Sequence, residues 1–131
     1  MHDKYLYEYA VIRLVPKVER EEFVNVGVIV FCKGNDFLKM LYQIDKNKIR
    51  SLSSENFSEE VEEEYEQYLN AFEKITNGEK ECGPVSLMDV PSRFRWLTAV
   101  RSSVLQTSRP HPGFSTDLDQ TLLRLFNELV I

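Results

Sequence analysis

Two long runs near the start of the chain, residues 5–15 and 24–32, alternate in the way that β-strands require. The first run is largely apolar on both faces, which predicts a central strand covered on both sides. On one face of the second run we expect a continuous valine-rich core surface, formed by Val24, Val26, Val28, Val30 and Cys32. A charged corner at residues 17–22 joins the runs, so the pattern predicts a long hairpin.

Residues 33–36 have the composition of a turn, and residues 37–44 form a third apolar run that returns along the second. The first three strands are therefore predicted to form an antiparallel meander. Asp45 is suited to cap a short helix after the third strand. A polar loop is predicted to follow at residues 51–56.

The clearest helix in the sequence comes next, with Ser58 as its N-cap and Gly78 just beyond its end. Apolar residues recur in it at spacings of three and four and form one stripe, which consists of Val61, Tyr65, Tyr68, Leu69, Phe72 and Ile75. Glutamates occupy the opposite face. We interpret them as a solvated surface; the alternatives are contact with a basic partner or mimicry of nucleic-acid charge.

The last third of the chain is less regular. A loop is predicted at residues 79–86, and a short helix is predicted to begin near Pro91 and to end at about Ala99. Residues 102–107 are predicted as a fourth strand. Residues 108–115, which contain two prolines and a glycine, are predicted as a loop.

A capping box at residues 116–119 is predicted to open a final helix, whose apolar stripe consists of Leu118, Leu122, Leu125, Phe126 and Leu129. Strands followed by helices predict an α+β fold, in which an antiparallel β-meander of three to four strands packs against about three to four helices. The length of 131 residues predicts a single domain over residues 1–131.

Composition removes several classes of protein. The longest apolar run, residues 26–32, is far shorter than the roughly 20 residues of a membrane-spanning helix. The start of the chain lacks the pattern of a signal peptide, so we expect a cytoplasmic protein that does not enter the membrane. Cys32 and Cys82 have no histidine at metal-binding spacing, and we interpret both as reduced structural thiols.

The net charge of −5 is unevenly distributed along the chain. Residues 51–90 carry eleven acidic and two basic residues, whereas the segments on either side are slightly basic. An acidic protein lacks the basic face that general binding to nucleic acid requires. We therefore expect no general nucleic-acid binding, although local basic sites are compatible with this charge.

The motifs of common enzyme classes are absent from the sequence. The five glycines occur singly, so neither of the glycine-rich phosphate-binding loops is present. A nucleophile elbow, an H-E-x-x-H motif and a paired-cysteine zinc site are also missing. We expect no metal and no cofactor, and the sequence leaves open whether the protein is an enzyme.

Three groups of polar residues interrupt apolar segments and are candidates for a site. In the hairpin, Arg13 and Asn25 are predicted to lie opposite each other or one place apart, with Glu21 and Glu22 at the corner. Gly27 leaves room there for a ligand or a neighbouring backbone. The alternative is structural, with Arg13 facing solvent and Gly27 marking a bulge or making room for a core tyrosine.

The second group lies in residues 93–108 and contains Arg95, Arg101, Ser102, Gln106 and Ser108. Arginine beside neutral hydrogen-bond donors suits a phosphate or carboxylate. Arg93 and Arg95 are about 200° apart around a regular helix and cannot both face one pocket, so Arg101 is the better candidate. Alternatively, these arginines pair with the acidic helix and stabilise the fold.

The third candidate is His111, which lies between Pro110 and Pro112. A histidine with a rigid backbone is suited to act as a general base or as a proton-sensitive hydrogen-bond donor. A surface or structural histidine is the alternative, because no nucleophile is evident beside it.

These residues also resemble a known family. The segments that carry the resemblance are residues 9–13, 20–28, 93–99 and 101–108, together with His111 and Gly113. In this combination they are similar to the bacterial domain-of-unknown-function family 3037. The chain departs from the family pattern at Val100, where proline is common, and at Pro112, where threonine is usual.

The resemblance implies a small bacterial cytoplasmic protein of a family without an established activity. Such proteins are often encoded beside a kinase-fold protein of the HipA type, which implies a protein partner. The leading hypothesis is a non-catalytic binding or regulatory module. The alternative is a small enzyme or a nucleotide- or phosphate-binding domain with an anionic ligand. The ligand-binding candidates are Arg13, Glu21, Glu22, Asn25, Arg95, Arg101, Ser102, Gln106, Ser108 and His111.

Overall fold

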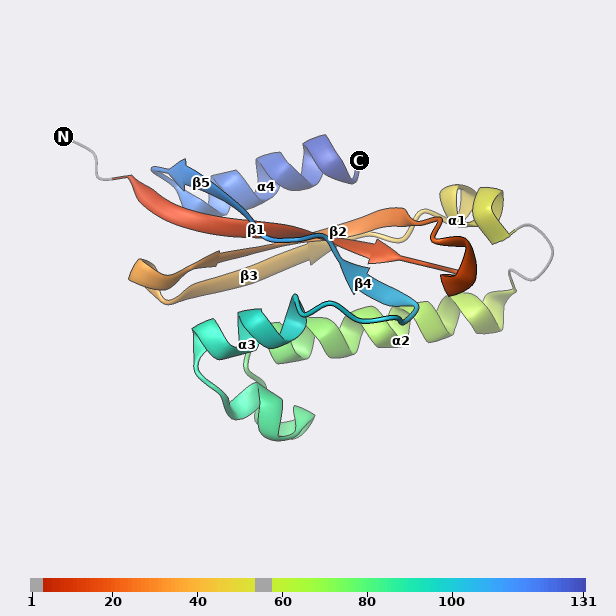
Figure 1. Ribbon diagram of the computed structural model, residues 1–131, viewed down its shortest axis with the longest axis horizontal. Helices are drawn as coiled ribbons and strands as arrows, with labels where there is room; N and C mark the ends of the chain where they lie inside the picture. The colour runs from red at the N-terminus through yellow and green to blue at the C-terminus, as the bar shows by residue number, and fades with distance from the viewer. Residues whose placement is uncertain (1–3, 54–57) are drawn as a thin grey trace.

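The computed structural model describes residues 4–53 and 58–131, which form an α+β fold with a five-stranded antiparallel sheet (Figure 1). The strands are β1 (Tyr5–Leu14), β2 (Val24–Cys32), β3 (Phe37–Tyr42), β4 (Leu105–Thr107) and β5 (His111–Ser115). The helices are α1 (Lys46–Ser53), α2 (Glu59–Thr76), α3 (Val90–Leu97) and α4 (Leu118–Leu129). The predicted fold class is confirmed.

The first three strands form the predicted antiparallel meander, with β2 between β1 and β3. Arg13 pairs with Asn25 across the hairpin, as the sequence predicted. A turn of 3₁₀ helix, Val18–Arg20, forms the charged corner, and Glu21 after it has a left-handed backbone with φ of 56°. The other edge of β1 pairs with both β4 and β5, so β1 is a central strand.

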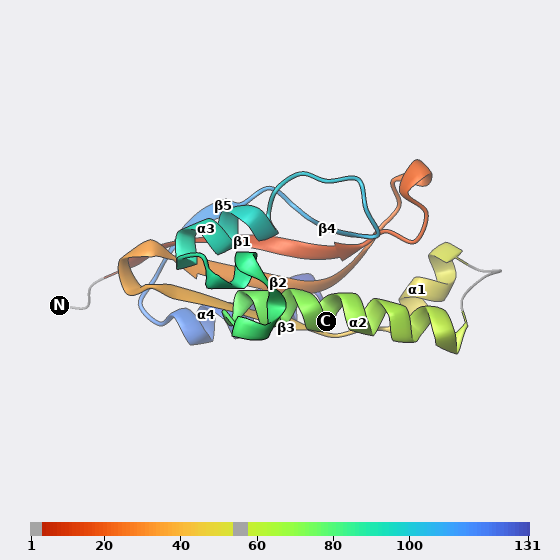
Figure 2. The same ribbon diagram turned by 90° about the horizontal axis from the view of Figure 1, so that it is seen from below.

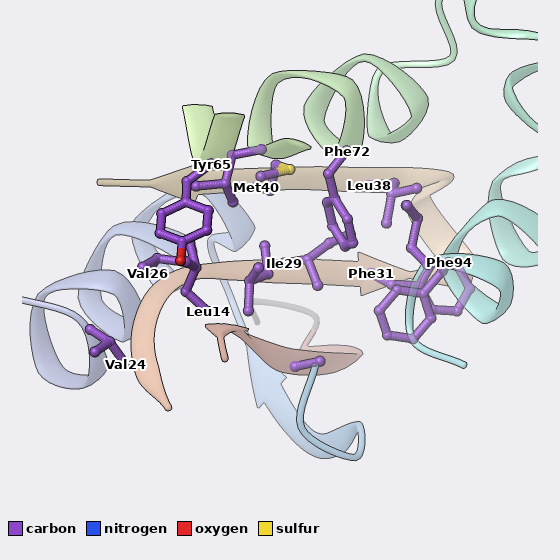
Figure 3. Packing of buried hydrophobic residues seen from close by; sticks show 14 of the residues in the cluster. Leu14, Val24, Val26, Ile29, Phe31, Leu38, Met40, Tyr65, Phe72 and Phe94 are labelled. Carbon is purple, nitrogen blue, oxygen red and sulfur yellow. The ribbon is translucent and has the colours of Figure 1, made fainter. Parts of the chain in front are cut away.

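Helices cover both faces of the sheet. In Figure 1, α4 lies on one face, and α2 and α3 lie on the other. Figure 3 shows the core between the sheet and the α2 and α3 layer, where Phe31 of β2 stacks on Phe94 of α3 with ring centroids 4.7 Å apart. The apolar character of both faces of β1 is therefore explained, because each face packs against a separate hydrophobic cluster.

The five residues of the predicted valine-rich face are all buried, as expected, but they do not share one face of β2, because a β-bulge interrupts the alternation. The register shifts by one residue where Ile12 pairs with Gly27 and Arg13 pairs with Asn25. An extra residue in a strand reverses the direction of the side chains that follow it. Val24 and Val26 consequently pack toward α2, whereas the other three members of the predicted face, Val28, Val30 and Cys32, pack toward α4.

The loop predicted at residues 108–115 is also wrong, because its second half is strand β5. The strand pairs with the first half of β1, from Tyr9 opposite His111 to Tyr5 opposite Ser115. Proline is tolerated here because β5 is an edge strand whose outward N–H groups need no partner in the sheet. Together, β4 and β5 follow β1 along most of its length, with an irregular step between them.

Other boundaries differ in detail. Residues 51–53 continue α1 instead of beginning the predicted loop, and residues 54–56 of that prediction lie outside the described residues. The fourth strand begins only at Leu105. Two short 3₁₀ turns occupy residues 80–87 instead of a plain loop. Asp117 alone caps α4, accepting a hydrogen bond from the Gln120 backbone, so the capping box is wrong.

The long helix α2 matches its prediction. Ser58 is its N-cap and accepts a hydrogen bond from the Val61 backbone, and Gly78 beyond its end has a φ of 69°. Among the described helices, none has the length and apolarity needed to cross a membrane.

Candidate functional site

Two adjoining clefts lie beside the connection between α3 and β4, residues 98–104, which Figure 2 shows arching from the end of α3 to the start of β4. The first, which we call the apolar cleft, has a volume of about 560 Å3. Its lining comes from the hairpin corner, α2, α3, the α3–β4 connection and β4: Val18, Tyr68, Ala71, Phe72, Ile75, Trp96, Leu97, Arg101, Ser103, Val104, Leu105 and Gln106.

The second, which we call the arginine cleft, has a volume of about 570 Å3. It is lined by Arg13, Val15, Val18, Glu21, Phe23, Val100, Arg101, Ser102 and Gln106. Val18, Arg101 and Gln106 line both clefts, so the two form one continuous surface around the α3–β4 connection.

Helix α3 fixes the position of Trp96. Asp89 is the N-cap of the helix and accepts a hydrogen bond from the Ser92 backbone through its carboxylate, and Pro91 lies in the first turn. Hydrogen bonds from Ser92 hold the pKa of Asp89 below its usual value. Phe94 is buried on one side of α3, which leaves Trp96 on the side that faces the cleft with 40% of its surface exposed.

Backbone and side-chain hydrogen bonds hold the α3–β4 connection against β1. The Val15 backbone N–H donates to the Val104 carbonyl over 2.7 Å, which extends the pairing beyond β4. Gln106 donates from its side-chain amide to the Ser103 carbonyl, also over 2.7 Å. These bonds fix Gln106 at the junction of the two clefts.

Arg13 reaches the arginine cleft from the end of β1. Its guanidinium lies over the ring of Phe23, with the central carbon 4.2 Å from the ring centroid. Its Nε is buried and has no hydrogen-bond partner. A cation on an aromatic face is held in place without having its charge neutralised.

Arg101, the second arginine of this cleft, also packs on an aromatic ring. Its guanidinium lies over the Trp96 ring, 4.6 Å from the centroid, and donates to the Trp96 carbonyl. Arg13 and Arg101 are absent from the ion pairs formed by the described residues. The charged groups lining the arginine cleft are therefore two guanidinium groups and the exposed carboxylate of Glu21.

Tyr68 forms part of the α2 wall of the apolar cleft. Its hydroxyl donates to Glu64 over 2.5 Å, and this hydrogen bond raises the pKa of Tyr68 above its usual value. Because the hydroxyl is hydrogen-bonded to Glu64, the Tyr68 ring keeps its position in the wall of the apolar cleft. Tyr68 belongs to the apolar stripe that the sequence predicted for this helix, and 42% of its surface is exposed.

Five of the ten predicted site residues meet in the arginine cleft: Arg13, Glu21, Arg101, Ser102 and Gln106. Glu22 is outside the cleft lining and forms an ion pair with Arg20. Asn25 donates to the Leu129 carbonyl at the end of α4 over 3.1 Å, so its amide faces that helix. The Oδ1 atom of Asn25 is buried without a partner.

The remaining three candidates lie elsewhere. Arg95 forms a two-pronged ion pair with Glu8 of β1, with N–O distances of 3.1 and 2.8 Å. The Ser108 hydroxyl accepts a hydrogen bond from the Val11 backbone inside the sheet. His111 is exposed on β5, and its ring lies 5.4 Å from that of Tyr9.

The clefts are lined by polar, charged and aromatic groups as well as by aliphatic side chains. The described lining contains hydroxyl, amide, guanidinium and carboxylate groups, and His111 and both cysteines lie outside it. In the part of the chain that the structure describes, no three metal-binding side chains gather at one place. Aromatic rings and arginines around an apolar hollow suit a partner that combines an apolar group with an anionic one.

Phe23, Val100 and Trp96 were not among the predicted ligand-binding residues. Phe23 and Trp96 each hold an arginine, and Val100 is 99% exposed at the rim of the arginine cleft. The sequence does contain a signal for Phe23 and Trp96, because each is a large aromatic side chain next to polar ones, in residues 20–25 and 93–101. Which of these side chains the fold would leave exposed depends on tertiary packing.

A family described as "Protein of unknown function (DUF3037)" matches residues 9–130, nearly the whole chain. The chain therefore belongs to this family. Neither the comparison with curated proteins nor that with solved structures gave a match.

Proposed function

We propose that this member of the DUF3037 family is a non-catalytic module that binds another protein through the apolar cleft and its exposed rim. The observation that carries the proposal is an apolar hollow of about 560 Å3 bordered by the partly exposed rings of Trp96 and Tyr68. Large apolar side chains gathered on a surface are typical of an interaction site.

The composition of this surface supports a protein partner. Tryptophan, tyrosine and arginine are the residues that most often dominate the binding energy of protein interfaces. Trp96, Tyr68 and Arg101 line the same cleft, and Val100 projects from the adjoining rim with 99% of its surface exposed. Bringing these side chains together in the free protein leaves apolar surface in water, and a partner would remove that surface from water.

The resemblance suggests the first partner to test, a kinase-fold protein of the HipA type from the same genome. Co-expression followed by size-exclusion chromatography at micromolar concentration measures the association. We expect the two chains to elute together. Separate elution would contradict this partner.

Variants of the cleft test the surface itself. Trp96→Ala and Tyr68→Ala each remove an aromatic ring from the wall, and we expect each to weaken the complex by about tenfold or more, as loss of a major interface residue does. Phe114→Ala is the matched control, because Phe114 is 68% exposed on β5 and outside both clefts. Equal weakening by Phe114→Ala would rule out this surface, and circular dichroism verifies that each variant is folded.

A second candidate is a small enzyme or phosphate-binding domain, and one observation favours it: Arg13 and Arg101 line the same cleft. His111, the general base that such an enzyme would use, lies outside this cleft on β5. Titration with ATP, followed by NMR, tests the candidate. Saturable shifts confined to the arginine cleft would support it, and their absence at millimolar ATP would contradict it.

A further inference from the structure

The arginine cleft contains positive charge that the described protein groups do not neutralise. We infer that it is the anion-binding part of the proposed protein-binding surface, and that it takes a carboxylate which the partner presents beside a bulky apolar side chain. This inference rests on the proposed function and adds the chemistry of the partner to it.

The first step of the argument concerns the two guanidinium groups. Arg13 contacts the Phe23 ring and has a buried Nε without a hydrogen-bond partner, and Arg101 contacts the Trp96 ring and the Trp96 carbonyl. The aromatic contacts fix both side chains, and neither cation has an ion-pair partner among the described residues. Three other arginines of the chain do form ion pairs, as Arg95 does with Glu8.

The second step concerns the sign and size of the charge. Glu21 also lines the arginine cleft, so the two arginines and this carboxylate leave one unit of positive charge there. A single monoanion neutralises this charge, whereas a phosphate dianion would leave a net negative charge beside Glu21 and has a larger desolvation cost. The protein as a whole carries a net charge of −5, so the sign of the charge in the cleft is opposite to that of the whole protein.

The third step is the position of the apolar cleft. Val18, Arg101 and Gln106 line both clefts, so a group in the arginine cleft lies next to one in the apolar cleft. An aromatic or branched aliphatic side chain suits the apolar cleft, because Phe72, Ile75 and Leu97 contribute to its wall. A polypeptide segment can place such a side chain beside a carboxylate, either from a neighbouring acidic residue or from its own terminus.

The probes are three small molecules that differ in charge. N-acetyltryptophan carries an indole and a carboxylate, N-acetyltryptophanamide is its neutral counterpart, and phenyl phosphate carries a phosphate. Each is titrated into the ¹⁵N-labelled full chain, and amide shifts in residues 98–106 measure binding. We expect N-acetyltryptophan to bind about tenfold more tightly than the amide, the effect of one charge-assisted contact. We also expect it to bind more tightly than phenyl phosphate.

Charge-removing variants assign this selectivity to the cleft. We expect N-acetyltryptophan and its amide to bind with about equal affinity to Arg13→Gln, and likewise to Arg101→Gln. Arg124→Gln is the matched control, because Arg124 lies on α4, pairs with Glu128 and is outside both clefts. The preference should be unchanged in this variant.

Three results would overturn the inference: equal binding of acid and amide, tighter binding of phenyl phosphate, or no saturable shift in residues 98–106 with N-acetyltryptophan. Loss of selectivity in Arg124→Gln would overturn it as well. Its failure is distinguishable from that of the proposed function. If the partner still co-elutes and Trp96→Ala still weakens the complex, only the anion site is wrong. If acid selectivity is present but no complex forms with the HipA-type protein, the anion site stands and the tested partner is wrong.

Discussion

At the scale of single residues, Ser108 shows how a side chain can replace a backbone group in the sheet. The residue lies at the step between β4 and β5, where the pairing with β1 becomes irregular. Its backbone N–H donates to the Val11 carbonyl over 2.8 Å, and its hydroxyl accepts from the Val11 N–H over 2.8 Å. The hydroxyl thus satisfies a buried donor that would otherwise have no acceptor in the sheet.

Removing the Ser108 hydroxyl is expected to destabilise the folded protein. We predict that Ser108→Ala lowers the free energy of unfolding by about 1–3 kcal/mol, because it leaves the buried Val11 N–H without an acceptor. Urea denaturation measures the change. Ser102→Ala is the control, since Ser102 is exposed, and it should change stability by less than about 0.5 kcal/mol. Equal effects of the two variants would contradict a structural role for the Ser108 hydroxyl.

The arginines show what residue type can and cannot predict. Sequence reasoning proposed that the arginines of residues 93–101 bind an anion or pair with the acidic helix. Among the described residues, none of the three forms an ion pair with an acidic side chain of α2. Arg95 pairs with Glu8 of β1, Arg93 donates to the Met88 carbonyl over 2.7 Å and to the Thr76 carbonyl at the end of α2, and Arg101 lies on Trp96. The chemistry of each group was predictable from its type. Its partner depends on contacts between segments far apart in the chain, which local patterns do not encode.

At the scale of elements, the bulge in β2 explains why alternation predicted the strands but not their faces. Both runs of alternating residues do form strands, with boundaries within one or two residues of those expected. A bulge adds a single residue and leaves little trace in the pattern, because the sequence on both sides of it remains apolar. Gly27 was the available signal, since a lone glycine inside a strand often marks a bulge or a close backbone approach.

We predict that Gly27→Ala destabilises the protein by about 1–3 kcal/mol, the usual cost of overpacking a core. A Cβ atom at position 27 would lie 2.7 Å from the Leu41 carbonyl oxygen and 3.1 Å from the Cβ atom of Tyr42. The carbonyl belongs to the paired backbone of β3 and cannot move without disturbing the sheet. Thermal unfolding followed by circular dichroism measures the change.

Gly34→Ala is the matched control, because a Cβ atom at Gly34 would meet no other group within 4 Å. We expect this substitution to be neutral or to stabilise the protein by up to about 1 kcal/mol, through the smaller conformational freedom of the unfolded chain. Equal effects at the two positions would show that the close approach of β3 does not constrain Gly27.

At the scale of the whole molecule, the layered α+β architecture was predictable, whereas the clefts were not. The meander and the helices follow from patterns within each segment, and both hydrophobic stripes of α2 and α4 could be read from their spacing. The clefts form where the hairpin corner, α2, α3 and the α3–β4 connection meet. The position of these elements relative to one another depends on how the layers pack. Arg13 and Arg101 could therefore be identified as candidates from the sequence, but their location in one cleft could not be predicted.

The two hydrophobic clusters share the sheet, and this arrangement predicts cooperative unfolding. Strands β1 and β2 contribute side chains to both clusters, so loss of the α4 layer exposes strands on which the α2 and α3 layer also depends.

Leu122 of α4 is 4% exposed, and we predict that Leu122→Ala lowers the free energy of unfolding by about 2–5 kcal/mol. Trp96, the single tryptophan, reports from α3 on the opposite face of the sheet. Its fluorescence and the far-ultraviolet circular dichroism should therefore shift to the same lower midpoint in urea. Leu123→Ala is the control, because Leu123 lies on the same helix with 47% of its surface exposed, and it should change both urea midpoints only slightly. If the fluorescence and circular dichroism midpoints of Leu122→Ala differ, the two layers unfold independently.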